Sequence, residues 1–278
     1  MARTSRNTIG TDRYRYLLGD AVREAARLRA QARLWDPVSL ALFDRVGVRP
    51  GWRVLEVGPG QGSLHMALRR RVRRPVDAVE RSAAFAERLT VLSRRDRFGP
   101  GRIWQTDLKN APLPRAHYDL IFARWVFLFL PDPAAHLRTL VRSLKPGGRI
   151  ALQEYHRETL ALVPRPDDWF EFLAADRAFF ASEGGDVSIG GRLPLLYRRA
   201  GLDTIDTQVT IKTGRPGTPV WKWLTTYFMG VLDQMAAFAP FSERAATRLR
   251  REWLAAGRRK TSLLISPAVV DVVGRKPR

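Results

Sequence analysis

The sequence predicts an α/β fold, a doubly wound and mostly parallel sheet with helices on both faces. An apolar run at 52–57 ends in a glycine-rich turn and is followed by a helical stretch at 63–73. Short apolar runs then keep alternating with helical stretches as far as residue 155, which is typical of βαβ units. An alternating segment at 202–211 and a terminal apolar run at 269–273 predict two further strands.

The turn after the first strand, Gly58-Pro59-Gly60-Gln61-Gly62, begins two residues after Glu56. Glycines let the backbone turn sharply and let a ligand lie against bare peptide. Such a turn holds nucleotide-like cofactors at the carboxyl end of the first strand, and the spacing G-x-G-x-G differs from the dinucleotide pattern G-x-G-x-x-G. Taken alone, the same glycines would also suit a tight turn without a ligand.

The second strand, expected at 75–80, ends in Glu80, about 20 residues after the glycine loop, the offset at which an acid reaches ribose hydroxyls. A carboxylate there accepts two hydrogen bonds from a vicinal diol. The next expected elements are strands at 103–108 and 118–125, a helix from Pro131-Asp132-Pro133 to Leu144, and a strand at 149–152 after Lys145-Pro146-Gly147-Gly148.

These motifs, in this order over roughly residues 50–155, resemble those of the class I (Rossmann-like) S-adenosylmethionine-dependent methyltransferases of the small-molecule type. The match includes the glycine loop, the acid Glu80, the pair Asp107-Leu108 and the L-K-P-G-G signature that starts at Leu144. The resemblance implies a seven-stranded sheet with a reversed final hairpin and helical lid insertions. It also implies S-adenosyl-L-methionine as cofactor and S-adenosyl-L-homocysteine as product.

The resemblance assigns roles to the residues that match the family's cofactor motifs. Glu56 is expected near the methionine moiety and its ammonium, and Glu80 at the ribose diol. Asp107 is expected to accept from the adenine amino group while Leu108 packs on the ring. The remaining expected cofactor residues are Gly58, Gly60 and Gly62 of the glycine loop, and Arg124 in the loop that faces the sulfonium.

Residues 1–48 are expected to form N-terminal lid helices over a methyltransferase core at 49–278. The apolar spacing predicts one helix over 20–34, and Asp36-Pro37 predicts the start of another that runs to Val46. Tyr14 and Tyr16 are candidate substrate contacts, with ordinary packing as the alternative.

Two helical insertions are expected in the core, at about 166–200 and 218–257. Both are rich in aromatic residues at helical spacing. The aromatics either fix the helices to the sheet or form the wall of an apolar substrate cavity, and we expect at least one to face the pocket. The candidate substrate residues are Trp125, Trp169, Trp221 and Phe228.

Methyl transfer requires little from the protein besides alignment and exclusion of water, because positive sulfur already activates the methyl group. A general base is needed when the acceptor is a hydroxyl or a protonated amine. Glu154, Tyr155 and His156, just after the fifth strand, are the catalytic candidates, and His156 has a near-neutral reference pKa. The alternative for His156 is a structural role at the strand end.

The chain has no cysteine and four scattered histidines, so no metal site is expected. No apolar run approaches the roughly 18 residues that cross a bilayer, and the basic N-terminus lacks the apolar stretch of a secretory signal, so a cytoplasmic protein is expected. The formal net charge is +21, but arginines spread along the whole chain indicate a compositional bias more than a nucleic-acid surface.

The sequence therefore predicts transfer of a methyl group to an O, N or C atom of a small, apolar or aromatic metabolite. One alternative is an RNA or protein methyltransferase that uses the basic surface, although Ala123-Arg124-Trp125-Val126 stands where a D/N-P-P-Y motif would be. Another is a non-catalytic member that binds the cofactor. The oligomeric state is left open, with a homodimer as one arrangement.

Overall fold

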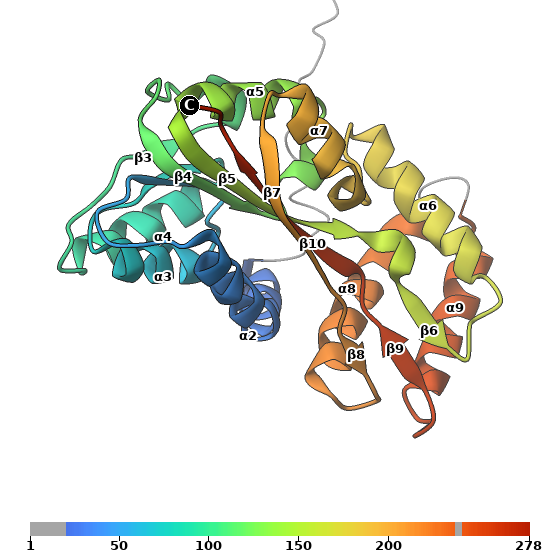
Figure 1. Cartoon of the computed structure of the whole chain (residues 1–278). Coiled ribbons are helices and arrows are strands. Elements are labelled where there is room, and N and C mark those ends of the chain that lie inside the picture. Colours follow the sequence, from blue (N-terminus) through green and yellow to red (C-terminus); the bar gives the residue numbers. More distant parts are fainter. Residues whose placement is uncertain (1–20, 237–240) are drawn as a thin grey trace, which may run out of the picture.

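The computed structural model describes residues 21–236 and 241–278 and contains a seven-stranded sheet (Figure 1). The order of its strands is β3-β2-β1-β4-β5-β10-β7. Neighbours among β1 to β5 pair in parallel, whereas β10 is antiparallel to both β5 and β7. This topology confirms the predicted fold. The strands are β1 (Val54–Val57), β2 (Asp77–Glu80), β3 (Ile103–Gln105), β4 (Tyr118–Arg124), β5 (Leu144–His156), β7 (Asp203–Thr210) and β10 (Ala268–Arg275).

Helices cover both faces of this sheet, as Figure 1 shows. Along β4, Leu120 and Phe122 belong to the core under one layer of helices, and Ile121 and Ala123 belong to the core under the other. Period-two alternation explains why a strand buried on both faces reads as one continuous apolar run. The helices beside the sheet are α2 (Ala21–Val46), α3 (Ser63–Val72), α4 (Ala83–Arg94), α5 (Pro133–Ser143) and α7 (Leu193–Arg199).

The expected pair of N-terminal helices is wrong, because α2 is a single helix with Pro37 inside it. Trp35, Leu42, Phe43 and Val46 recur on one face of α2 and are fully buried. Burial of this stripe outweighs the missing hydrogen bond at the proline, since tertiary packing rather than propensity supplies most helix stability. Tyr14 and Tyr16 lie outside the described residues.

Beyond β5 the chain forms a second, smaller sheet and a helical layer. The small sheet has the order β6-β9-β8, with β6 at Ala161–Val163, β9 at Leu263–Ile265 and β8 at Thr213–Gly214. It was not predicted, because strands of two or three residues carry no readable periodicity. The helical layer consists of α6 (Trp169–Ser182), α8 (Pro219–Ala236) and α9 (Glu243–Ala256). These helices fall within the two expected insertions, whose limits stay a prediction.

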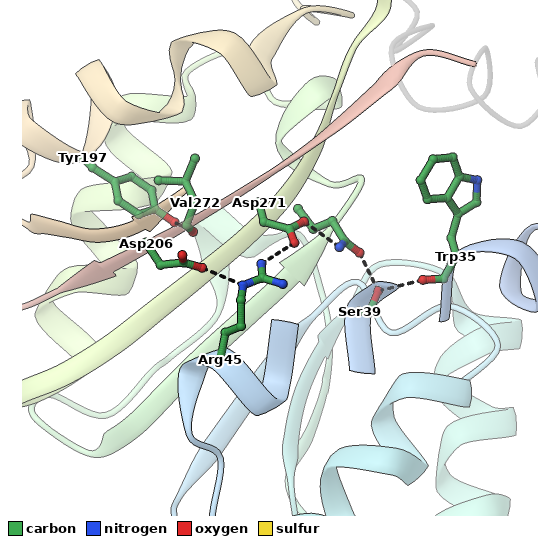
Figure 2. A network of polar contacts seen from close by, with 8 residues as sticks. Trp35, Ser39, Arg45, Tyr197, Asp206, Asp271 and Val272 are labelled. Carbon is green, nitrogen blue, oxygen red and sulfur yellow. Dashed lines mark hydrogen bonds and ion pairs between the residues drawn. The ribbon is translucent and has the colours of Figure 1, made fainter. Parts of the chain in front are cut away.

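A polar network fixes α2 to the sheet (Figure 2). The guanidinium of Arg45 donates to Asp206 on β7 at 2.9 Å and to Asp271 on β10 at 2.7 Å. Asp271 also accepts from the amide of Gln153 on β5 at 2.7 Å, and Ser39 of α2 donates to the Gln153 oxygen. The helix that leads into the sheet is therefore held by three strands at once.

Among the described helices, none combines the length and the apolar character that a membrane span requires.

Candidate active site

The glycine loop lies between β1 and α3 and has a backbone that only glycine adopts readily. Gly58, Gly60 and Gly62 have φ angles of +67°, +53° and +85°. A Cβ on Gly58 would lie 2.5 Å from Cγ2 of Val126, whereas a Cβ on Gly60 would meet open space. The loop therefore packs tightly against the segment after β4 on one side and is open at its centre.

Glu80 lies at the end of β2 with its carboxylate against the glycine loop. One carboxylate oxygen accepts from the backbone N–H of Gly60 at 3.1 Å and the other from that of Ser82 at 2.8 Å. The residue is 7% exposed, and this burial raises the pKa of the carboxyl group while the two N–H donors act in the opposite direction. The sequence-predicted acid and glycine loop are thus in direct contact.

The other predicted cofactor acids flank this contact. Oε2 of Glu56 lies 3.1 Å from Nδ1 of His65 on α3, and both residues are buried. Because an ionised carboxylate can only accept, the proton in this hydrogen bond belongs on Nδ1 of His65, which donates to Glu56. His65 was not predicted. On the other side, Asp107 caps the short helix at Leu108–Asn110 by accepting from Lys109 at 3.2 Å, and Leu108 is buried.

Arg124, at the end of β4, points to α2. Its guanidinium donates to Ser39 at 2.9 Å and to Asp36 at 2.8 Å, and it lies 4.6 Å from the ring centroid of Trp125. Arg124 therefore holds α2 against the end of β4. A contact between Arg124 and the cofactor stays a prediction.

Trp125 begins the loop after β4 in a left-handed backbone conformation, with φ at +55°. Its ring stacks on Tyr155 with centroids 4.9 Å apart and meets Trp35 edge-on at 6.2 Å. Burial raises the pKa of the Tyr155 hydroxyl, so this group stays protonated at neutral pH. Tyr155 is thus placed to donate a hydrogen bond rather than to act as a base.

Glu154 positions the loop that carries Trp125. The side chain is fully buried, and one carboxyl oxygen accepts from the backbone N–H groups of Val126 at 2.8 Å and Phe127 at 2.7 Å. The other oxygen has no hydrogen-bond partner among the described residues. Burial raises the pKa of this carboxyl group to about 8. Glu154 therefore connects β5 to the loop that packs on Gly58.

We expect the stability that Glu154 contributes to fall as pH rises from about 5 to 8. The carboxyl group has an ordinary pKa of 4.5 and a folded-state pKa of about 8, so the native state holds a proton that the unfolded state releases in this window. Urea unfolding of wild type and Glu154→Gln at several pH values measures the difference. The excess in unfolding free energy of the wild type over Glu154→Gln should shrink by about 1.4 kcal/mol per unit of pKa shift. If the difference in unfolding free energy between wild type and Glu154→Gln does not change with pH, the raised pKa of Glu154 is contradicted.

His156 makes contacts that neither Glu154 nor Tyr155 shares. Its Nδ1 lies 3.4 Å from the carbonyl oxygen of Ser188, and its Nε2 lies 3.9 Å from Glu158. Strand alternation puts His156 and Glu154 on the face opposite Tyr155. His156 instead lines a cavity of about 310 Å³, which is also lined by Glu158, Arg177, Asp186 and Arg192.

Three of the predicted substrate residues pack together in the helical layer. Trp169, Trp221 and Phe228 are each at most 5% exposed. Phe228 stacks on Trp253 at 4.1 Å, Trp169 stacks on Phe228 at 6.0 Å, and Trp221 lies 5.8 Å from Trp253. These contacts support the structural alternative for this group, whereas Trp125 lies at the strand ends. Within the described residues, no three potential metal ligands gather at one place.

The strand order, the glycine loop after β1 and the acid at the end of β2 define a Rossmann-like fold, the class that holds nucleotide-like cofactors at the carboxyl edge of its sheet. Residues 55–152 match the family described as "Methyltransferase domain". This part of the chain is therefore similar to methyltransferase domains.

Similar proteins agree with that assignment. The ubiquinone/menaquinone biosynthesis C-methyltransferase UbiE of Azotobacter vinelandii is 30% identical over 146 residues, which are 50% of this chain and 55% of that protein. The chain thus spans about half the length of the curated relatives it matches.

Solved structures show the same fold. The YcgJ protein of Bacillus subtilis has a TM-score of 0.58 at 17% identity, covering 86% of this chain and 97% of that one. Phosphoethanolamine N-methyltransferase 2 of Haemonchus contortus, in complex with S-adenosyl-L-methionine, has a TM-score of 0.52 at 20% identity, covering 86% of this chain and 52% of that one.

Proposed function

We propose that this chain is a methyltransferase that uses S-adenosyl-L-methionine and releases S-adenosyl-L-homocysteine. The observation that carries the proposal is the buried carboxylate of Glu80 held against the backbone N–H of Gly60. This contact joins an acid that suits a ribose diol to a loop whose centre is open for a ligand.

The residues around this contact fit the cofactor. Glu80 would take the ribose hydroxyls, and Glu56 the ammonium of the methionine moiety. Asp107 and Leu108 follow β3, which pairs with β2, so they would take the adenine. When bound, the cofactor would supply an electrophilic methyl group, which reacts with a nucleophile aligned in line with the sulfur.

The acceptor is proposed to be a small apolar or aromatic molecule that lies beside Trp125 and Tyr155. Tyr155 stays protonated, and Glu154 is occupied by the backbone of the loop after β4. An acceptor that ionises by itself, or that reacts through an electron-rich carbon, suits such a site. The printed name of the relative UbiE, a C-methyltransferase, supports carbon as the acceptor atom.

We expect Glu80→Ala to weaken the binding of S-adenosylhomocysteine by about 1.5–3 kcal/mol, which is about 10- to 150-fold, because hydrogen bonds to a charged group are lost. Calorimetric titration of S-adenosylhomocysteine, S-adenosylmethionine and NAD into wild type and variant measures this. The wild type should bind both adenosyl ligands and not NAD.

Two further variants make the result specific to the carboxylate. Glu80→Gln keeps the shape of the side chain and removes its charge, so its affinity for S-adenosylhomocysteine should lie between those of the wild type and Glu80→Ala. Glu87→Ala removes an exposed acid from the neighbouring helix α4 and should bind like the wild type. Unchanged affinity in Glu80→Ala would remove the ribose role, and preference for NAD would overturn methyl transfer.

A further inference from the structure

Three tryptophans from distant parts of the chain meet beside the loop after β4. Trp35 comes from α2, Trp125 from that loop and Trp223 from α8. The ring centroids of Trp35 and Trp125 lie 6.2 Å apart at an interplanar angle of 89°, and those of Trp35 and Trp223 lie 5.8 Å apart at 69°. We call these three residues the tryptophan cluster.

Every indole N–H of the tryptophan cluster is buried without a hydrogen-bond partner among the described residues. The contrast is Trp253 in the helical layer, whose Nε1 donates to Thr225 at 3.0 Å. A buried donor left unsatisfied costs about 1–3 kcal/mol. Trp35 contacts the other two tryptophans, and no described residue accepts from any of the three N–H groups, which points to acceptors supplied by a bound molecule.

The chemistry of the cluster restricts that molecule. An indole N–H donates and cannot accept, so the molecule must present acceptor atoms such as oxygens. Aromatic faces and edges favour a flat, apolar body. Two cations already lie by the rings, with Nζ of Lys212 at 5.2 Å from the Trp35 centroid and the Arg124 guanidinium at 4.6 Å from the Trp125 centroid. A cationic ligand would be repelled by them, whereas a neutral or anionic one would not.

The cluster is also connected to the proposed cofactor site. Trp125 is half-buried, and the next residue, Val126, is the one that approaches Gly58 of the glycine loop. Tyr155, stacked on Trp125, adds a protonated hydroxyl. The cluster therefore lies next to the ends of β4 and β5, where the methyl acceptor is proposed to lie.

We propose that the tryptophan cluster binds the oxygen atoms of a flat aromatic or conjugated acceptor, neutral or anionic, of the phenol or aryl carbonyl class. The proposal rests on the proposed function and assigns its substrate class. Trp35, Trp223 and Lys212 become specificity residues that the sequence did not single out.

The first test compares three probes of equal ring size by calorimetry on wild type saturated with S-adenosylhomocysteine: 2-naphthol, 2-methylnaphthalene and 2-naphthylmethylamine. Hydrogen bonds to the indoles should make 2-naphthol bind about 5-fold or more tighter than 2-methylnaphthalene, and the ammonium should bind weakest. Equal binding of 2-naphthol and 2-methylnaphthalene, or tightest binding of the ammonium, would overturn the proposal.

The second test removes single N–H donors while keeping an aromatic ring. Trp35→Phe and Trp223→Phe should each weaken the binding of 2-naphthol by about 5-fold and leave the binding of 2-methylnaphthalene nearly unchanged. Trp253→Phe, a matched change in the helical layer, should leave both probes unchanged. Equal losses for both probes in the cluster variants would reduce the cluster to apolar packing.

Indole ¹⁵N–¹H spectra of the wild type give a measurement that does not depend on variants keeping their fold. The signals of the tryptophan cluster, assigned by the phenylalanine variants or by elimination among the eight tryptophans, should shift with 2-naphthol while that of Trp253 stays. If the indole signals of the tryptophan cluster do not shift when 2-naphthol is added, the proposal is overturned. If S-adenosylhomocysteine fails to bind while 2-naphthol shifts these signals, the proposed function fails and the binding site stands; the reverse result rejects the site alone.

Discussion

Gly58→Ala should weaken S-adenosylhomocysteine binding by about 2–4 kcal/mol, which is about 30- to 700-fold. The added methyl group would lie 2.5 Å from Cγ2 of Val126, on a backbone with φ at +67°. A loop that shifts to relieve this overlap must be forced back when the ligand binds, so the strain appears as lost affinity. Calorimetry of wild type and variant measures it.

Two comparisons separate the steric part from the backbone part. Gly60→Ala has a φ of +53° but open space around the new methyl group, so about 1–2 kcal/mol is expected from the backbone alone. Val126→Ala in the Gly58→Ala background removes the clashing methyl and should restore part of the affinity. If the double variant binds no better than Gly58→Ala, the contact with Val126 is not the cause.

Asp271→Ala should lower the free energy of unfolding by about 2–4 kcal/mol, because it removes a fully buried carboxylate that pairs with the partly exposed Arg45 and accepts from Gln153. Asp271 is fully buried and accepts from both Arg45 and Gln153. Its loss removes the acceptor of the Gln153 amide and the contact that joins Arg45 of α2 to β10. Urea denaturation followed by circular dichroism gives the difference from the shift in midpoint.

Asp206→Ala is the matched control, since Asp206 contacts the same guanidinium from a more exposed place on β7. Its side chain is 32% exposed, and that of Asp271 is fully buried. Exposed ion pairs contribute about 0–1 kcal/mol, so only a small loss is expected. Equal losses in the two variants would show that burial does not distinguish them.

The parts of the site that the sequence predicted are those built from consecutive residues. The glycine loop, Glu80 and Asp107 each lie at the end of a strand or just after it, so the strand order alone brings Glu80 and Gly60 into contact. Side chains alternate between the two faces of a strand, so the sequence could also have placed Tyr155 on the face opposite Glu154 and His156. The three residues were grouped only because they are adjacent in the chain.

The tryptophan cluster could not be predicted, because its members depend on how distant helices pack. Trp35 lies in α2 and Trp223 in α8, and each looks like an ordinary core residue in its own helix. The single helix α2 was missed for a related reason. Asp36-Pro37 is a good local signal for the start of a helix, and only the packing of α2 on the sheet makes the helix continue through it.

The place of β10 determines the order in which the sheet can be completed during synthesis. β7 (Asp203–Thr210) leaves the ribosome before β10 (Ala268–Arg275), yet β10 separates it from β5. At about 5–20 residues per second, a nascent β7 waits several seconds for its partner. Ile205 and Val209 stay exposed even in the finished fold, and Asp203 and Asp206 place negative charge beside them, which disfavours pairing with another exposed strand during that interval.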